Sequence, residues 1–465
     1  MEQGSTMTRT TNTRRRRVLA VAAAATTTVL LAAGCAGGSG GGDEDTLKVA
    51  YQKFGTFTQM DDHMKAVAAE FEAANPDMTV ELVPIAGQND DYFTKLALMN
   101  RSPSTAPDVQ YEDTAKLKSD AAAGFLLPLD EYTEAWDDWD MFYDNAKEAG
   151  VGEDGKLYGV PMGTDTRALW YNEELFAAAG LPVPWEPATW DDVLDAAATL
   201  KEASPDVVPF NIYSGKPQGE GATMQGFEML LYGTEGGTLF DDDEGKWVTG
   251  SQGFVDSLGF IEDVYQGGVG PTPEQALDTN IATIVGGEWL PQSKVGIALD
   301  GSWLSGTWLE TGTNPWPEWS EVLGQAPMPT QDGQAPGAVS MSGGWTLAVG
   351  ANSANPDKAF EFIEQSLSKE GSQSYDIAAS QIAVRSDVAE DPEYVAANPS
   401  FEFFSSIVPV THFRPATTDY NRISSEITIA MEAVMTGQQS PEEAAAAYDE
   451  ALVGIVGEDA TVEAD

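Results

Sequence analysis

The sequence predicts an α/β protein of two lobes joined by a hinge, with a ligand cleft between the lobes. The chain has 465 residues, more than one hydrophobic core usually supports, and 42% of them are hydrophobic. From Thr46 onward, strand-like and helix-like patterns alternate. Between Leu157 and Lys201, a polar turn separates two short apolar runs, which is the pattern expected of a strand that passes from one lobe to the other.

The N-terminal 34 residues have the pattern of an export signal. Four arginines at 14–17 precede an apolar run at 18–33, and Gly34 is followed by Cys35, the only cysteine of the chain. The apolar run is shorter than the roughly 18 residues that a membrane-spanning helix needs. We therefore expect a signal peptide at 1–34 and a flexible, glycine-rich tether at 35–45.

The five residues that end at Cys35, LAAGC, resemble the lipoprotein box of bacteria. This resemblance implies a signal peptide of the lipoprotein type and a lipid attached to Cys35. Ordinary cleavage next to an incidental thiol is the alternative.

Composition excludes several classes of function. The net charge is −50, which argues against nucleic acid as a partner, because phosphate contacts need patches of lysine and arginine. A solvated acidic surface explains this charge, and adaptation to high salt is a second explanation. The two histidines, His63 and His412, with the single cysteine make a zinc site untenable, and we expect no metal and no cofactor. We expect His63 at the surface and His412 in the core or lining a pocket.

The chain after the tether begins with a strand, a helix and a second strand. Alternation at 47–51 and at 78–83 predicts the strands, and helical spacing at 64–71 predicts the helix between them, which Asn75-Pro76 ends. Such a unit implies a parallel strand pair with a right-handed connection.

Ligands of parallel sheets lie beyond the carboxyl ends of the strands. The sequence places 52–58 at one such end, and it places Tyr111 and Asp113 just after another predicted strand at 108–110. Tyr111 and Asp113 are therefore candidates for ligand contact.

The predicted passage between the lobes has apolar runs at 157–161 and 168–171. The turn between them offers hydroxyls, the carboxylate of Asp165 and the guanidinium of Arg167. We expect a binding edge there, with a local ion pair as the alternative role of Arg167. Asn172 should cap a helix that Gly180 ends, and a capping box at 189–192 should open the next helix.

The second half of the chain also contains patterns typical of strands and helices. We expect a helix at 224–232, an exposed acidic turn at 241–244 rather than a calcium loop, and a strand at 294–299 that leads to Trp303. Residues 341–349 contain Trp345 and predict a second passage between the lobes.

The C-terminal part is predicted to be mostly helical. Asn355 should begin a helix that Gly371 ends, and further helices are expected at 423–435 and after Ser440. Arg414 lies between Phe413 and Pro415, in the loop that precedes the first of these two helices.

Several of these motifs occur together with the spacing of one family. They are K-x-Y-G-x-P from Lys156, Y-N-x-x-x-F from Tyr171, A-G-L from Ala179 and P-x-T-W-D-D from Pro187. The chain resembles the family 1 extracellular solute-binding proteins of ABC importers, the maltose-binding-protein-like group, from Thr46 to about Val456. The resemblance implies the periplasmic-binding-protein-like type II fold, with lobes formed by 46–164 plus 339–375 and by 165–338 plus 376–456, and an acidic tail at 457–465.

The same resemblance implies the function and the partners. It implies an exported, lipid-anchored monomer on the outer face of the cytoplasmic membrane, which captures a sugar and delivers it to two permease subunits served by a cytoplasmic ATPase. It implies no enzymatic activity. A secreted glycoside hydrolase, or a surface sensor or adhesion module of the same fold, are the alternatives.

A sugar ring needs aromatic side chains for its apolar face and charged or amide groups for its hydroxyls. The resemblance points Trp303 and Trp345 into the cleft and assigns sugar hydroxyls to Asp165, and we add Arg414 as a further candidate. At 420–426 only Tyr420 is aromatic, a departure that argues against maltodextrin itself.

Overall fold

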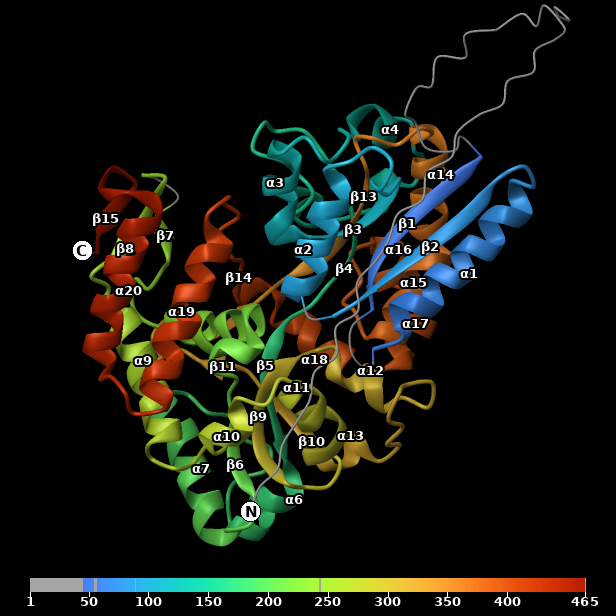
Figure 1. Ribbon diagram of the computed structural model, residues 1–465. Coiled ribbons are helices and arrows are strands. Elements are labelled where there is room, and N and C mark those ends of the chain that lie inside the picture. Colours follow the sequence, from blue (N-terminus) through green and yellow to red (C-terminus); the bar gives the residue numbers. More distant parts are fainter. Residues whose placement is uncertain (1–44, 54–56, 88, 242–243, 465) are drawn as a thin grey trace, which may run out of the picture. The chain divides into compact units, whose positions relative to one another are not determined.

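The computed structural model describes residues 45–53, 57–87, 89–241 and 244–464 (Figure 1). The predicted export signal, most of the tether and Cys35 lie outside these residues. In the described part of the chain, no helix combines the length and the apolar character needed to cross a bilayer.

The first sheet has five strands in the order β2-β1-β3-β13-β4. β1 is parallel to β2 and to β3, whereas β13 is antiparallel to β3 and to β4. The predicted parallel pair with a helical connection is therefore confirmed. The strands are β1 (Thr46–Lys53), β2 (Thr79–Ala86), β3 (Val109–Asp113), β4 (Gly159–Thr164) and β13 (Gly344–Val349).

Helices distant in sequence pack together around this sheet. The N-terminal α1 contacts both α14 and α15, and Figure 1 shows these two orange helices beside the blue one. The helices of this part are α1 (Gln59–Ala74), α2 (Asn89–Asn100), α3 (Thr114–Ala122), α4 (Asp130–Glu134), η1 (Trp139–Met141), α5 (Asp144–Glu148), α14 (Pro356–Ser366), α15 (Lys369–Ala379), α16 (Ser386–Ala389) and α17 (Pro392–Ala397).

The second sheet has four strands in the order β10-β5-β9-β6. β5 is antiparallel to β9 and β10, and β6 is parallel to β9. Its strands are β5 (Arg167–Asn172), β6 (Val208–Asn211), β9 (Val295–Gly301) and β10 (Leu323–Ala326).

The remaining helices of the described residues accompany the second sheet. They are α6 (Glu173–Ala179), α7 (Trp190–Ala203), η2 (Lys216–Gln218), the π-helix η3 (Ala222–Glu228), α8 (Met229–Leu231), α9 (Gln252–Tyr265), α10 (Pro273–Ala276), α11 (Ile281–Ile284), the π-helix η4 (Val285–Trp289), α12 (Leu304–Trp308), α13 (Trp319–Val322), α18 (Phe401–Ser406), η5 (Val408–Val410), α19 (Tyr420–Met435), α20 (Pro441–Val456) and η6 (Glu458–Ala460).

Each large sheet has a hydrophobic core of its own. The first core, around the five-stranded sheet, includes Val49, Phe71 and Phe362. The second core, around the four-stranded sheet, includes Trp170 and Phe210. The chain passes from the first sheet to the second between β4 and β5, at the polar turn that the sequence predicts.

The chain returns to the first sheet between β12 (Ala338–Met341) and β13. Beyond residue 375 the chain contacts both cores, since Val384 belongs to the first core, whereas Ile382, which forms a bridge with Thr164, belongs to the second. β12 lies between β11 (Met328–Pro329) and β14 (Thr411–His412) in a small sheet.

Residues 457–464 of the predicted acidic tail take part in the fold. β15 (Thr461–Glu463) pairs in parallel with β8 (Lys246–Thr249), which also pairs with β7 (Phe240–Asp241). The sequence did not predict β15, because a strand of three residues is too short to show an alternation of apolar and polar residues.

Four predicted helix ends are confirmed. The Asn172 side chain accepts from the Leu175 N–H, and Gly180 adopts the left-handed conformation that ends α6. The capping boxes that begin at Thr189 and at Ser440 are both present.

Two local predictions are wrong. Gly371 does not end the helix that follows Asn355, because α14 ends at Ser366 and Gly371 lies in the first turn of α15, where its N–H donates to Ser368 Oγ. His63 is buried rather than exposed. Its Nε2 lies 2.9 Å from Ser366 Oγ, and α14 and α15 cover it, which the local sequence of α1 cannot reveal.

We expect Thr189→Ala to lower the free energy of unfolding by about 1 kcal/mol, because the first turn of α7 loses its side-chain cap. Urea unfolding followed by circular dichroism measures this change. Thr199→Ala in the same helix removes a hydroxyl that caps nothing, and it should leave the stability within about 0.5 kcal/mol. Equal losses in the two variants would show that the cap is not the cause.

Candidate functional site

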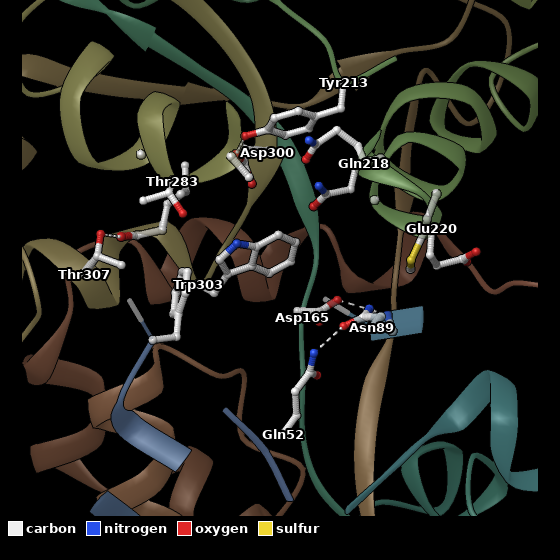
Figure 2. A pocket seen from close by; sticks show the side chains of 18 of the residues that line it. Gln52, Asn89, Asp165, Tyr213, Gln218, Glu220, Thr283, Asp300, Trp303 and Thr307 are labelled. Atoms are coloured by element: carbon white, nitrogen blue, oxygen red, sulfur yellow. Dashed lines mark hydrogen bonds between the residues drawn. The ribbon is translucent and has the colours of Figure 1, made fainter. Parts of the chain in front are cut away.

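A cavity of about 600 Å³ is lined by residues from both the first and the second core (Figure 2). All seven side chains predicted to bind a ligand line it, namely Tyr111, Asp113, Asp165, Arg167, Trp303, Trp345 and Arg414. They come from positions more than 300 residues apart, so the tertiary structure alone brings them together.

The turn between β4 and β5 carries the first pair of charges. Arg167 Nη1 forms a short ion pair with Asp165 Oδ1 and donates to the backbone oxygen of Met341 at 3.1 Å. Asp165 Oδ1 also accepts from the N–H of Gly343 at 3.0 Å. These bonds hold the two passages between the sheets against each other, and the predicted local ion pair of Arg167 is present.

Trp303 lies directly beyond β9, whose pairing with β5 sets its position. Arg167 is opposite Gly301 in that register, and its guanidinium carbon lies 4.8 Å from the centre of the Trp303 ring. A side chain at Gly301 has no room, because a Cβ there would lie 2.0 Å from the ring. The glycine therefore allows the indole to lie close to the strand while it lines the cavity (Figure 2).

The first core contributes an aromatic wall. Tyr111 is in β3 and Trp345 is in the neighbouring β13, and their rings stack with centroids 4.1 Å apart and planes 3° apart. Phe93 of α2 stacks on Trp345 at 5.9 Å. Tyr111 lies within β3 rather than after its end, as the sequence analysis had placed it, because the strand runs on to Asp113.

Arg414 connects the first core to the second. Its Nη2 lies 2.7 Å from Asp113 Oδ1, and its Nη1 lies 3.2 Å from Glu220 Oε1. Asp113 also caps α3, accepting from the N–H of Ala115. Ser424 Oγ donates to Glu220 Oε2 at 2.6 Å, so the carboxylate of Glu220 is held from two sides.

A buried carboxyl group, Glu228, lies behind this cluster. Burial and the nearby charge of Glu220 raise the pKa of Glu228 to about 8. The Tyr420 oxygen lies 2.7 Å from oxygens of both Glu220 and Glu228, but one hydroxyl proton serves one acceptor only. A protonated Glu228 resolves this, because it can donate to Tyr420 while Tyr420 donates to Glu220.

Asp300 is a cavity residue that the sequence analysis did not select. It is buried at the end of β9, where it accepts from Tyr213 OH at 2.6 Å and from the Gly301 N–H at 2.7 Å. Burial raises its pKa to about 6. Its position just before Gly-Ser-Trp303 was the available signal.

Of the other lining residues, Gln52 falls in the predicted strand end at 52–58, whereas Gln59 and Gln225 were missed because no local motif marks them. Gln59 and Gln225 are buried, and their Oε1 atoms have no partner within the described residues. Gln52 donates to Asn89 Oδ1 at 3.0 Å (Figure 2). Buried amide groups without partners suit hydroxyl groups of a ligand.

His412, left open between core and pocket, is half-buried and stacks on Tyr232 with ring centres 4.6 Å apart. It is not among the residues that line the cavity. Among the described residues, no group of three or more histidine, cysteine, aspartate or glutamate side chains is arranged to hold a metal ion.

Sequence comparison places the chain among binding proteins. The family model described as bacterial extracellular solute-binding protein matches residues 55–373. A binding protein of Brucella abortus strain 2308 is 24% identical over 385 residues, which cover 82% of this chain and 86% of that protein. The arabinooligosaccharide-binding protein of Halalkalibacterium halodurans is 25% identical over 193 residues, 41% of this chain and 40% of that one.

Solved structures with the same fold cover most of the chain. A solute-binding protein of Thermotoga lettingae, bound with α-D-tagatose, has a TM-score of 0.75 at 25% identity and covers 89% of this chain and all of its own. The GacH receptor of Streptomyces glaucescens, solved unliganded and with acarbose, has a TM-score of 0.74 at 26% identity and covers 89% of this chain and 99% of its own. The predicted type II periplasmic-binding fold is confirmed by this likeness.

The raised pKa of Glu228 predicts how stability depends on pH. A carboxyl with a pKa of about 8 in the folded state and an ordinary value of 4.5 in the unfolded state stabilises fully below 4.5, and this contribution is lost as pH rises to about 8. Relative to wild type, Glu228→Gln should therefore gain stability steadily from pH 5 to pH 8.

Urea unfolding at several pH values measures this difference. Glu450→Gln, at an exposed position of α20, is the control, and its free energy of unfolding should change with pH as that of wild type does. A constant difference between Glu228→Gln and wild type over this pH range contradicts a protonated Glu228.

Proposed function

The chain belongs to the family of bacterial extracellular solute-binding proteins, and from this we propose that it captures a sugar, a mono- or oligosaccharide, in the cavity and delivers it to an ABC importer. The observation that carries this proposal is the convergence of aromatic rings, carboxylates and guanidinium groups in one cavity between two cores. Family members and structural neighbours are binding proteins rather than enzymes.

The chemistry of the lining supports a sugar ligand. Trp303 and the stacked pair Tyr111 and Trp345 offer apolar ring surfaces, which suit the C–H face of a sugar. Asp165 and Asp113 offer charged acceptors for hydroxyl groups. The relatives from Thermotoga and Streptomyces were solved with α-D-tagatose and with acarbose, which agrees with this class of ligand.

We infer that the two cores are lobes that close on the ligand. Three segments connect them: residues 164–167, residues 341–344, and the segment that follows Val384. A few residues in each can absorb the change in backbone angles, as hinges do. A ligand that touches both lobes binds the closed arrangement better and shifts the population toward it.

Delivery implies partners on the membrane. We propose that the closed, loaded protein docks on two permease subunits driven by a cytoplasmic ATPase, and that it acts as a monomer. A lipid on Cys35, followed by the glycine-rich tether at 35–45, would hold it at the outer face of the cytoplasmic membrane.

We expect saccharide binding to change the tryptophan fluorescence of the purified protein. Trp303→Ala should weaken binding by about tenfold or more, because a buried aromatic contact with the ligand is lost. Titration with a panel of mono- to tetrasaccharides, followed by fluorescence and calorimetry, measures both effects. Trp139→Phe, which lies away from the cavity in the first core, is the control and should bind normally. Normal binding by Trp303→Ala removes this residue from the site.

Lipid attachment is tested separately in cells. Labelled palmitate should be incorporated into the full-length protein, and Cys35→Ser should abolish the label and release the protein from the membrane fraction. The sugar affinity of the released protein should stay unchanged, since Cys35 precedes the folded part. Incorporation of label into the Cys35→Ser protein would falsify the anchor at this residue.

A further inference from the structure

The inner wall of the cavity carries more negative than positive charge. Besides the exposed Glu288, four carboxylates, Asp113, Asp165, Glu220 and Asp300, line it together with two guanidinium groups, those of Arg167 and Arg414. All six side chains are largely or fully buried, so solvent screens them only weakly.

Both guanidinium groups are already engaged by carboxylates. Arg167 pairs with Asp165 and lies over the ring of Trp303. Arg414 is shared between Asp113 and Glu220, so these two carboxylates have one cation between them. A ligand that enters the cavity finds neither guanidinium without a carboxylate partner.

The remaining cation of the lining is at its periphery. The side chain of Lys216 is 55% exposed, and its Nζ lies 3.7 Å from Glu432 Oε1. Water screens a charge in this position, so it offers an incoming anion little attraction.

Asp300 has no cation within ion-pair distance among the described residues. Its two carboxylate oxygens accept from the Tyr213 hydroxyl and from the backbone of Gly301. Figure 2 shows Asp300 beside Tyr213. The charge of Arg167 stabilises this carboxylate only from beyond ion-pair distance, and Arg167 is already paired with Asp165, so Asp300 adds to the negative excess of the wall.

We propose that the cavity selects saccharides by charge: it rejects sugars that carry a carboxylate or a phosphate and accepts neutral sugars and sugars that carry a protonated amine. This inference deepens the proposed function and rests on it. The structural basis is that every cation of the lining already has a carboxylate partner, while Asp300 has no cation.

The physical reason is the cost of placing an anion in this wall. To reach a guanidinium, an anionic group must displace Asp165, Asp113 or Glu220 from its arginine, and the displaced carboxylate is then buried without a partner. If it displaces none, it lies near buried like charges, which repel it. Hydroxyl groups and amines meet no such cost, because they donate to the same carboxylates.

The first experiment compares matched disaccharides by titration calorimetry with the purified protein. The probes are maltose, cellobiose and α-1,4-galactobiose, each with the corresponding form that carries a carboxylate at C6 and the form that carries an amine at C2. For each neutral disaccharide that binds, we expect the acidic form to bind about tenfold more weakly or worse, and the amine form to bind equally well or better.

Two outcomes separate this inference from the proposed function. Binding of neutral and acidic forms with equal affinity overturns charge selection and leaves the sugar-binding function intact. If none of the probes binds, the proposed function is contradicted for these sugars, and charge selection among them is contradicted as well.

The second experiment changes the charge at Asp300. Asp300→Asn should raise the affinity for the acidic form relative to the neutral form by about threefold to tenfold, because one uncompensated charge is removed. Glu402→Gln, which removes an exposed carboxylate of α18 outside the lining, is the matched control and should leave this ratio unchanged.

Wild-type protein provides a second test without a substitution, over a pH range in which the carboxyl group of Glu228 also becomes fully protonated. The pKa of Asp300 is raised to about 6, so lowering the pH from 7.5 to 5.5 neutralises it. Of the groups that face it, Tyr213 stays protonated because burial raises its pKa, and Arg167 stays charged. The ratio of affinities should then shift toward the acidic sugar, and a ratio that is unchanged both in Asp300→Asn and at pH 5.5 removes Asp300 from charge selection.

Discussion

The contact on which the site depends is the buried pair of Asp165 and Arg167 at the turn between β4 and β5. The chain crosses between its two cores here, and a crossing strand must leave one sheet before it joins the next. The bonds from Arg167 to Met341 and from Asp165 to Gly343 tie this crossing to the second one. Because the pair is buried, losing one partner would leave an uncompensated charge, which is far more costly than losing both.

The pairing of β5 with β9 positions the ligand-facing side chains of the second core. β5 and β9 are held in register, so Arg167 lies opposite Gly301 and its guanidinium covers part of Trp303. On the other side, the register of β3 and β13 brings Tyr111 and Trp345 into a stack. Strand pairing, rather than contacts among the side chains themselves, therefore determines which groups line the cavity. The charges of the wall follow from this arrangement, since Arg414 must satisfy carboxylates that belong to both cores.

Much of the fold could be predicted from local chemistry. The ends of α6, α7 and α20 depend on side chains within four residues of each cap, so the sequence at 172–180, 189–192 and 440–443 predicted them. The seven candidate ligand-binding residues were chosen at predicted strand ends, at the crossings and in one loop, and all of them line one cavity. The burial of His63 could not be predicted, because it depends on contacts of α1 with α14 and α15, which are distant in the sequence. The role of Gly371 was misjudged, because this residue lies in the first turn of α15 and not at the end of α14.

The sequence by itself determined the α/β class, the capped helices, the crossing turn and the family, because each depends on neighbouring residues or on a motif with fixed spacing. The tertiary structure alone decided which charges meet. The engagement of Arg414 by Asp113 and Glu220, the raised pKa of Glu228 and the burial of Asp300 beside Tyr213 all result from packing between segments as far as 301 residues apart. The energies of such pairs depend on distance and burial, which only the folded chain sets.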